Sequence, residues 1–417
     1  MSIDAPTITL KELKKVIITG CHLHQWQGEG NESIKDVFRE QGTIQLDPLN
    51  PAGRNHDVFL FSRIKNYTAG EFENTCYHEN LVYEDSIPNT SAIFSDYAKL
   101  FHFRKTRETM YHRTRFEDIE KSFPSLIKNL LDKIKEYEKV KASDLAQYEA
   151  DIPEYKNFQS KAKQQGYWDR NILKYLGWAG EICVVGRDEG FKKIYGLTKS
   201  FFDEKKLSKP DLSPEEIEFQ RLQLKLRSYP VITEKLTRTP KGTFQLKSKH
   251  SWLTRIKLSV EDLVNLKEEN NRCIPTLVHC EEIDKYYIVP SNWKELEKTT
   301  IDNEMRAIAP LDPSIYDREL VNDVYSFEYS WEVYKRKKDR QWGYYVYPLL
   351  YNGAFIGRLE AKYAKNIKTL HFFNYQQEKR CDLDEEGIGA LRQLCNRWKN
   401  MIGAVNMIFD KSIPSND

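Results

Sequence analysis

The chain has 417 residues and a mass of 49.3 kDa, which exceeds one ordinary domain and predicts two to four folded units. Hydrophobic residues make up 40% and charged residues 30% of the sequence, a composition that excludes a disordered chain. The formal net charge of only +2 excludes a global positive field, so any binding to nucleic acid must come from local basic patches.

The seven cysteines are odd in number and scattered, and none forms a Cys-x-x-Cys pair. We therefore expect reduced thiols in an intracellular protein, and no zinc site. The first residues lack a basic and then apolar leader, and no apolar run approaches the roughly 18 residues that span a bilayer. A cytoplasmic protein without membrane attachment is expected.

The first hundred residues have the order of a winged helix. Apolar spacing predicts helices over 9–22 and 33–39, and a strand over 43–47 ends there because Pro48 cannot donate to a ladder. Pro51 can open the next helix at its first turn. Residues 76–94 are the candidate wing.

Two polar residues lie at the end of that strand, before the next predicted helix. Gln45 and Asp47 are two residues apart and would project from the same face of the strand. In the helix that follows, Arg54, His56 and Arg63 are expected to face solvent or a partner. The alternative is that Gln45 and Asp47 merely cap this helix, since an Asp before a helix is common.

The middle of the chain repeats the order of helices followed by a hairpin. Helices are predicted over 126–134, 168–178, 213–229 and 259–266, and hairpins over 180–197 and 273–289. Two basic stretches, 101–115 and 235–257, could track a phosphate backbone or form solvated faces.

The C-terminal quarter reads as strands. Aromatic and polar residues alternate over 325–333, the basic stretch 335–340 leads to a second strand at 342–350, and Asn352-Gly353 supplies a tight turn. Further strands over 355–363 and 369–375 precede a helix over 384–401. The predicted fold is therefore α+β: tandem winged-helix (helix-turn-helix) units over 1–119, 120–206 and 207–300, followed by a small antiparallel β-barrel-like domain over 301–417.

Several motifs resemble those of the winged-helix DNA glycosylases of the AlkZ/YcaQ type. They are Gln-aliphatic-Asp at 45–47, Arg-x-His and Phe-Ser-Arg at 54–63, Gly-Tyr-Trp at 166–168, Pro-Leu-Asp-Pro at 310–313, Tyr-Asp-Arg at 316–318 and Gly-Tyr-Tyr-Val-x-Pro-Leu-Leu at 343–350. The Asp in third place is typical of the YcaQ-like branch, which is associated with N7-alkylguanine adducts and interstrand crosslinks. Two features depart from the family pattern. Glu84–Ser91 lacks the usual Trp-x-His, and Asp57 stands where a second histidine is usual.

The resemblance implies a monofunctional DNA glycosylase that hydrolyses the N-glycosidic bond of alkylated purines, crosslinks included. Alkylation at N7 leaves the base cationic, so the enzyme needs to hold a water and to stabilise an oxocarbenium-like sugar. Asp47 is expected to act as the general base for the water and to supply the negative charge beside the sugar, and Gln45 would orient the water. Expected DNA contacts, on the first helix, the second unit and the basic stretch of the C-terminal domain, are Arg54, His56, Arg63, Trp168, Arg170, Lys174, Arg187, Arg336, Lys337, Lys338, Arg340 and Trp342.

We expect no cofactor and no metal, a monomer, double-stranded DNA carrying alkylated or crosslinked bases as partner, and association with the nucleoid. Two other classes compete. Asp312 with Glu360-Ala361-Lys362 mimics the acid-x-Lys pattern of metal-dependent nucleases. A non-catalytic winged-helix regulator would bind DNA without releasing a base.

Overall fold

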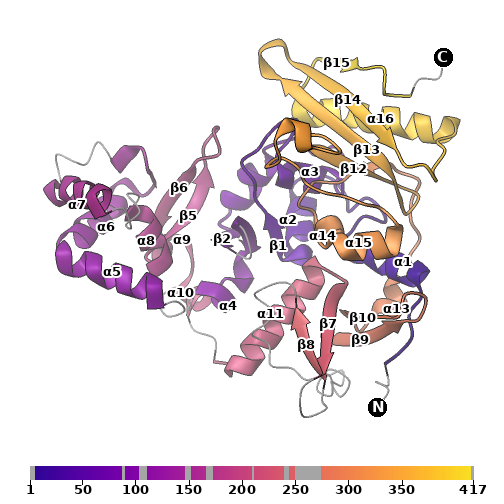
Figure 1. Cartoon of the computed structure of the whole chain (residues 1–417). Helices are drawn as coiled ribbons and strands as arrows, with labels where there is room; N and C mark the ends of the chain where they lie inside the picture. Colours follow the sequence, from indigo (N-terminus) through magenta and orange to yellow (C-terminus); the bar gives the residue numbers. More distant parts are fainter. Residues whose placement is uncertain are drawn as a thin grey trace. The chain divides into compact units, whose positions relative to one another are not determined.

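The computed structural model describes residues 5–86, 90–102, 110–145, 152–165, 172–208, 211–238, 244–248 and 274–414. The chain forms two compact units, and the mixture of helices and strands is the predicted α+β class (Figure 1). Unit 1 comprises residues 1–72, 87–91 and 213–417, and unit 2 comprises residues 73–86 and 92–212. Among the described helices, none combines the length and the hydropathy that crossing a bilayer requires.

Unit 1 begins with the predicted order of helix, helix, strand, helix. These elements are α1 (Leu10–Gly20), α2 (Gly30–Gln41), β1 (Thr43–Gln45) and α3 (Asn55–Phe61). Thr9 caps α1 in a box with Glu12, and the apolar face of α1 is buried in a core shared with strands and helices from the last third of the chain. The first and last parts of the sequence therefore fold together.

Unit 2 holds the middle of the chain. Its elements are a π-helical turn (Glu73–Tyr77), β2 (Val82–Ser86), β3 (Thr90–Phe94), a 3₁₀ turn (Ser95–Tyr97), α4 (Lys99–His102), α5 (Met110–Ser122), α6 (Leu126–Tyr137), β4 (Val140–Lys141), α7 (Pro153–Gln165), α8 (Ile172–Ala179), β5 (Ile182–Arg187), β6 (Lys193–Leu197), α9 (Thr198–Phe201) and α10 (Glu204–Leu207). Strand β3 starts at the boundary of the two units. The predicted helix and hairpin after residue 171 are confirmed, and their sheet has the order β4-β6-β5.

The chain returns to unit 1 through α11 (Pro214–Ser228), whose predicted capping box between Ser213 and Glu216 is confirmed. A four-stranded sheet of order β8-β7-β10-β9 follows, built from β7 (Ile232–Arg238), β8 (Phe244–Ser248), β9 (Pro275–Cys280) and β10 (Lys285–Pro290), with α13 (Trp293–Leu296) after it. The hairpin β9–β10 was predicted. The helix predicted over 259–266 lies outside the described residues.

The C-terminal part is an open five-stranded sheet of order β11-β12-β13-β14-β15. Its strands are β11 (Arg306–Ala307), β12 (Val346–Tyr351), β13 (Ala354–Ala364), β14 (Thr369–Gln377) and β15 (Asn406–Phe409), and its helices are α14 (Pro313–Tyr316), α15 (Arg318–Tyr325) and α16 (Glu385–Ile402), with 3₁₀ turns at Lys337–Asp339 and Lys365–Ile367. Asn352 and Gly353 both have positive φ, as the predicted tight turn requires. Unlike the predicted all-antiparallel arrangement, β15 pairs parallel to β14.

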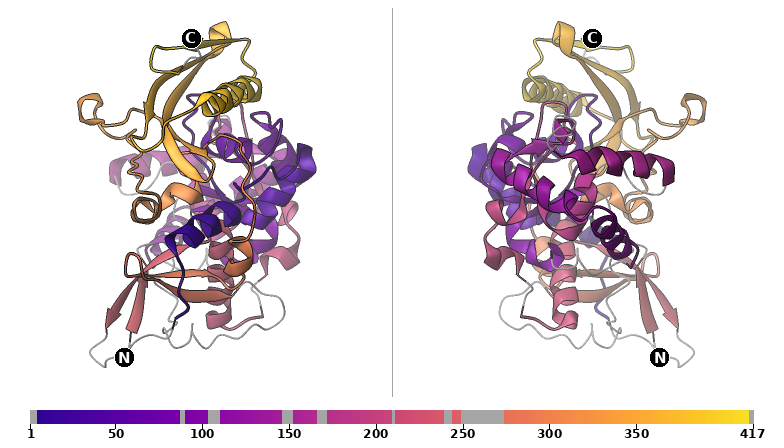
Figure 2. Two further views of the ribbon diagram at one scale, coloured as in Figure 1. Left: turned by 90° about the vertical axis from the view of Figure 1, so that its right-hand side faces the viewer. Right: turned by 90° about the vertical axis from the view of Figure 1, so that its left-hand side faces the viewer.

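Helix α16 packs on this sheet (Figure 2). Its Trp398 is fully buried and meets Tyr347 of β12 and Phe372 of β14 edge to face, at centroid distances of 4.7 and 5.8 Å. The helix predicted over 384–401 is thus confirmed, and it forms the second layer of the C-terminal part.

The strand predicted over 325–333 is wrong. Residues up to Tyr325 belong to α15, Ser326 has a left-handed backbone, and residues 326–333 form no strand. Phe327 and Tyr329 are buried, as the alternation predicted, and the Arg358 guanidinium donates to the Glu328 carbonyl between them. An alternation of apolar and polar residues predicts that every second side chain is buried. A strand also needs a neighbouring strand for its backbone hydrogen bonds, and the alternation does not predict that neighbour.

Candidate active site

Gln45 and Asp47 lie where β1 ends, and their positions follow the predicted alternation. Ile44 and Leu46 are buried, whereas Gln45 and Asp47 are half-buried. The two polar side chains therefore share the more open face of the extended segment.

The Asp47 carboxylate is held by the loop that follows it. Its Oδ1 accepts a hydrogen bond from the Leu49 N–H at 2.9 Å. Burial raises the pKa of Asp47 above its ordinary value, and the Leu49 N–H and the field of His56 oppose this rise. The carboxylate is poorly hydrated, which strengthens its interaction with any cation or polarised water placed beside it.

The capping alternative is wrong. Helix α3 begins only at Asn55, and the Asp57 carboxylate caps its first turn by accepting from the Arg54 N–H at 3.2 Å. The prediction that Pro51 opens the helix is wrong as well, because Gly53 has a φ of +114°, which a helix cannot contain. Asp47 is thus not occupied with capping.

Asn55 and Gln45 tie this region together. The Asn55 amide donates to the Gln45 backbone carbonyl at 2.9 Å and accepts from the Leu311 N–H at 3.0 Å. The Gln45 side-chain oxygen is buried and, within the described part of the chain, accepts no hydrogen bond. A buried acceptor without a donor is costly and is typical of a ligand or water position. Asn55 was not recognised from the sequence, since its role depends on a residue 256 positions away.

The loop between Asp47 and α3 is fixed by the C-terminal sheet and its helix. The Pro51 carbonyl accepts from the Tyr363 N–H of β13 at 2.6 Å, and the Ala52 carbonyl accepts from the Trp398 indole N–H at 2.6 Å. The motif is therefore held on two elements more than 300 residues away.

The prediction that His56 and Arg63 face solvent is wrong, because both side chains are fully buried. Arg63 forms a bidentate ion pair with Asp312, at 2.8 and 3.2 Å, and also donates to the Cys21 carbonyl at 2.8 Å. Asp312 is equally buried, so it is a counter-ion for Arg63 and does not supply the acidic ligand that the nuclease alternative needs. Arg54 is half-buried and remains a predicted contact.

Arg187 was predicted to contact DNA, and this prediction is wrong as well. Its guanidinium lies against the buried Glu84 carboxylate, with Nε–Oε1 and Nη2–Oε2 distances of 2.8 and 2.5 Å, and also donates to the Phe191 carbonyl. Glu84 belongs to the segment in which the family's Trp-x-His is missing, so that segment has a structural ion pair in unit 2. Lys174 is exposed on α8 and stays a predicted contact. Trp168 and Arg170 lie outside the described residues.

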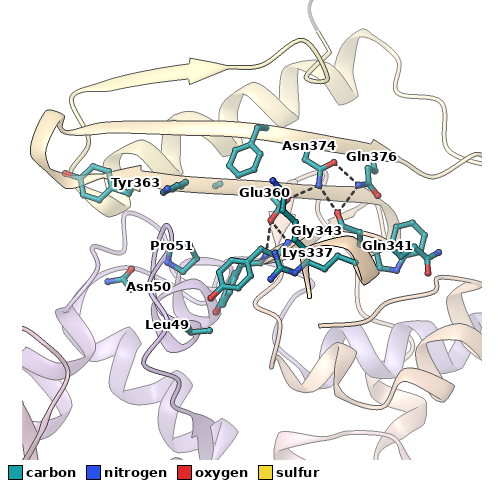
Figure 3. Close-up of a pocket in the computed structure, with 17 residues that line it drawn as sticks. Leu49, Asn50, Pro51, Lys337, Gln341, Gly343, Glu360, Tyr363, Asn374 and Gln376 are labelled. Carbon is teal, nitrogen blue, oxygen red and sulfur yellow. Dashed lines mark hydrogen bonds between the residues drawn. The ribbon is translucent and has the colours of Figure 1, made fainter. Parts of the chain in front are cut away.

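A cavity of about 770 Å³ opens beside the Asp47 loop, inside unit 1 (Figure 3). Leu49, Asn50 and Pro51 line one side of it, and β13 and β14 contribute Glu360, Ala361, Lys362, Tyr363, Phe373, Asn374 and Gln376. The segment before β12 supplies Lys337, Arg340, Gln341, Trp342, Gly343, Tyr344 and Tyr345. Burial raises the pKa of Tyr345 above its ordinary value, and the fields of Tyr347 and Asp47 add to this rise. Asp47 and Gln45 do not themselves line the cavity.

The basic segment is a loop with a 3₁₀ turn instead of the predicted hairpin, and the DNA contacts expected in it remain predictions. Arg336, Lys337 and Lys338 are exposed, and Arg340 and Trp342 are half-buried. Lys337, Arg340 and Trp342 line the cavity. Three predicted DNA contacts are thus brought to the same cavity as the loop that follows Asp47.

Two comparisons with known proteins give the family and a similar fold. The family described as "DNA glycosylase AlkZ-like" matches residues 38–392. The chain belongs to the AlkZ-like DNA glycosylase family. Among solved structures, the DNA glycosylase AlkZ of Streptomyces sahachiroi has a similar fold, with a TM-score of 0.58 and 13% sequence identity over 97% of this chain and 99% of that chain.

As an AlkZ-like DNA glycosylase, the protein is a DNA repair enzyme that acts on DNA. The match begins at Phe38 and therefore includes the Gln45–Asp47 pair, the cavity and the basic loop. The low identity to the solved structure means that the roles of individual residues must be argued from the geometry of this chain.

Proposed function

We propose that the enzyme hydrolyses the glycosidic bond of N7-alkylpurines in double-stranded DNA, including the bonds that hold interstrand crosslinks. The observation that carries this proposal is a half-buried carboxylate with a raised pKa at the end of β1, beside a buried Gln45 oxygen that has no hydrogen-bond donor among the described residues. The loop that follows Asp47 lines a cavity large enough for a nucleotide.

In this mechanism the side chains of the enzyme position the attacking water, accept its proton and stabilise the positive charge of the sugar. Cleavage of the C1′–N9 bond sends its electron pair to the cationic base, which leaves neutral, and positive charge develops on the sugar. Ionised Asp47 stabilises that charge and accepts a proton from the water that attacks C1′. The Gln45 oxygen accepts a hydrogen bond from the same water and orients it.

The size of the cavity and its position suit a bulky adduct. A base that is covalently joined to the opposite strand cannot enter a tight pocket, so a crosslink glycosylase needs an open site. Lys337 and Lys338 on the exposed loop would contact phosphates near the lesion.

The test is base release from a duplex that contains one N7-methylguanine. The wild-type enzyme is expected to release the free base and leave an alkali-labile site, and Asp47→Asn is expected to be roughly 10²- to 10³-fold slower. Asp36→Asn, the same substitution on the exposed face of α2, serves as the control and should match the wild type.

Three outcomes would change the proposal. Unaltered activity of Asp47→Asn would remove Asp47 from the chemistry. Binding without any base release would favour the non-catalytic alternative, and loss of activity with EDTA would favour a metal-dependent one.

A further inference from the structure

We propose that the cavity beside the Asp47 loop binds the alkylated base itself, and that Glu360 recognises the base by its positive charge. This inference rests on the proposed function, because it names the part of the substrate that the cavity takes.

Glu360 is a buried carboxylate on β13, with only 7% of its surface exposed, and it lines the cavity. Its Oε1 accepts from the backbone N–H groups of Tyr344 and Tyr345 at 2.8 and 2.9 Å, and its Oε2 accepts from the Asn374 amide at 2.9 Å. Within the described part of the chain, no cationic side chain forms an ion pair with it. A buried carboxylate whose hydrogen-bond donors are all neutral places an uncompensated negative charge at this point of the cavity wall.

The neighbouring Glu332 provides a comparison, because it also holds this loop by hydrogen bonds but has only a structural role. It is equally buried and accepts from the preceding backbone N–H groups, those of Trp342 and Gly343, at 2.8 and 3.4 Å. However, Lys335 forms an ion pair with it at 2.7 Å, and it does not line the cavity. The two glutamates therefore hold successive pairs of backbone N–H groups, and they differ in having a counter-ion and in facing the cavity.

The rest of the lining fits a flat, cationic aromatic ring. Trp342, Tyr344, Tyr345 and Phe373 supply aromatic surface, and aromatic rings attract cations as well as stack on bases. Arg358 already lies over the Trp342 ring at 3.9 Å, so the indole is fixed in place. The lysines and arginine of the cavity are suited to the phosphates of the same nucleotide.

Charge recognition of this kind acts on binding more than on the chemical step. The N7-alkylated base is cationic in the substrate and becomes neutral as the C1′–N9 bond breaks, so Glu360 attracts the substrate and releases the product. Removing its charge should raise KM and should not lower kcat.

The experiment compares two duplexes that resist hydrolysis because of a 2′-fluoro sugar, one with N7-methylguanine and one with guanine. The wild type is expected to prefer the methylated duplex, and Glu360→Gln to lose about tenfold or more of that preference, since the attraction between the carboxylate and the cationic base is lost. Glu332→Gln is the matched control. It removes the same charge from a carboxylate that holds the same loop and should keep the ratio of the two affinities.

Glu360→Asp retains the charge and shortens the side chain, so it separates charge from loop geometry. It should keep most of the preference even if both Glu360 variants melt at a lower temperature. An unchanged preference in Glu360→Gln, or an equal loss in Glu332→Gln, would overturn the inference. Base release from the hydrolysable methylated duplex is measured in parallel: release by a Glu360→Gln variant with unchanged KM refutes only the role of Glu360, whereas no release by the wild type refutes the proposed substrate.

Discussion

The buried ion pair between Arg63 and Asp312 supplies a prediction whose magnitude follows from its geometry. Both side chains are fully buried, and Asp312 accepts two hydrogen bonds from Arg63 and two more from Ser314, at 2.9 and 2.7 Å. Asp312→Asn leaves the Arg63 guanidinium buried without its counter-ion. The new amide N–H also faces the donors of Arg63 or Ser314, with which it cannot form hydrogen bonds. Breaking a buried pair from one side costs about 3–5 kcal/mol.

The assay is urea unfolding of the full chain, followed by tryptophan fluorescence. Asp36→Asn removes a carboxylate from an exposed pair with Arg39 on α2, and it should cost less than about 1 kcal/mol. The double variant Arg63→Met/Asp312→Leu should recover much of the loss, because an apolar pair of similar volume avoids the desolvation of both charges. If Asp312→Asn were no more destabilising than Asp36→Asn, the reasoning from burial would be refuted.

The ion pair with Asp312 also predicts that Arg63 does not contact DNA. Arg63→Lys keeps the positive charge but cannot reproduce the two-pronged contact with Asp312. We expect it to lower the free energy of unfolding, and to leave the affinity of the folded protein for DNA unchanged. A selective loss of DNA affinity without loss of stability would restore the original prediction for Arg63.

Three further predictions follow from the remaining charges. Because burial raises the pKa of Asp47 and the reaction needs its ionised form, kcat/KM on N7-methylguanine DNA should fall as the pH drops through a pKa above the ordinary value of 3.8; a pH profile that stays flat down to that value would contradict this. Lys337→Gln with Lys338→Gln should weaken binding to methylated and unmethylated duplexes equally and reduce the slope of log K against log salt by up to about 2, as measured by a salt titration, whereas an unchanged slope would show that neither lysine contacts a phosphate. Glu84→Gln leaves buried Arg187 without its counter-ion and should lower the melting temperature measured by circular dichroism, whereas an unchanged temperature would show that the pair does not stabilise unit 2.

Local signals in the sequence predicted many of the elements. The capping box of α11 and the Asn352-Gly353 turn between β12 and β13 need only neighbouring residues to form, so their prediction succeeded. The motif at Gln45 and Asp47 was found for the same reason, since alternation along one strand places both side chains on one face. Membership of a glycosylase family was already indicated by these motifs and is confirmed by the match over residues 38–392.

The tertiary structure alone decided which polar groups are available for function. From the sequence, Arg63 and Arg187 were expected to be surface cations. In the structure each pairs with a carboxylate 249 or 103 positions away, and their side chains are 0% and 7% exposed. In the sequence Glu360 belonged to the acid-x-Lys pattern of the nuclease alternative, and it became a candidate recognition residue because β13, β14 and the Asp47 loop line the same cavity. Local propensity acts over a few residues, whereas burial and charge compensation depend on contacts between distant segments, so only the folded chain could settle them.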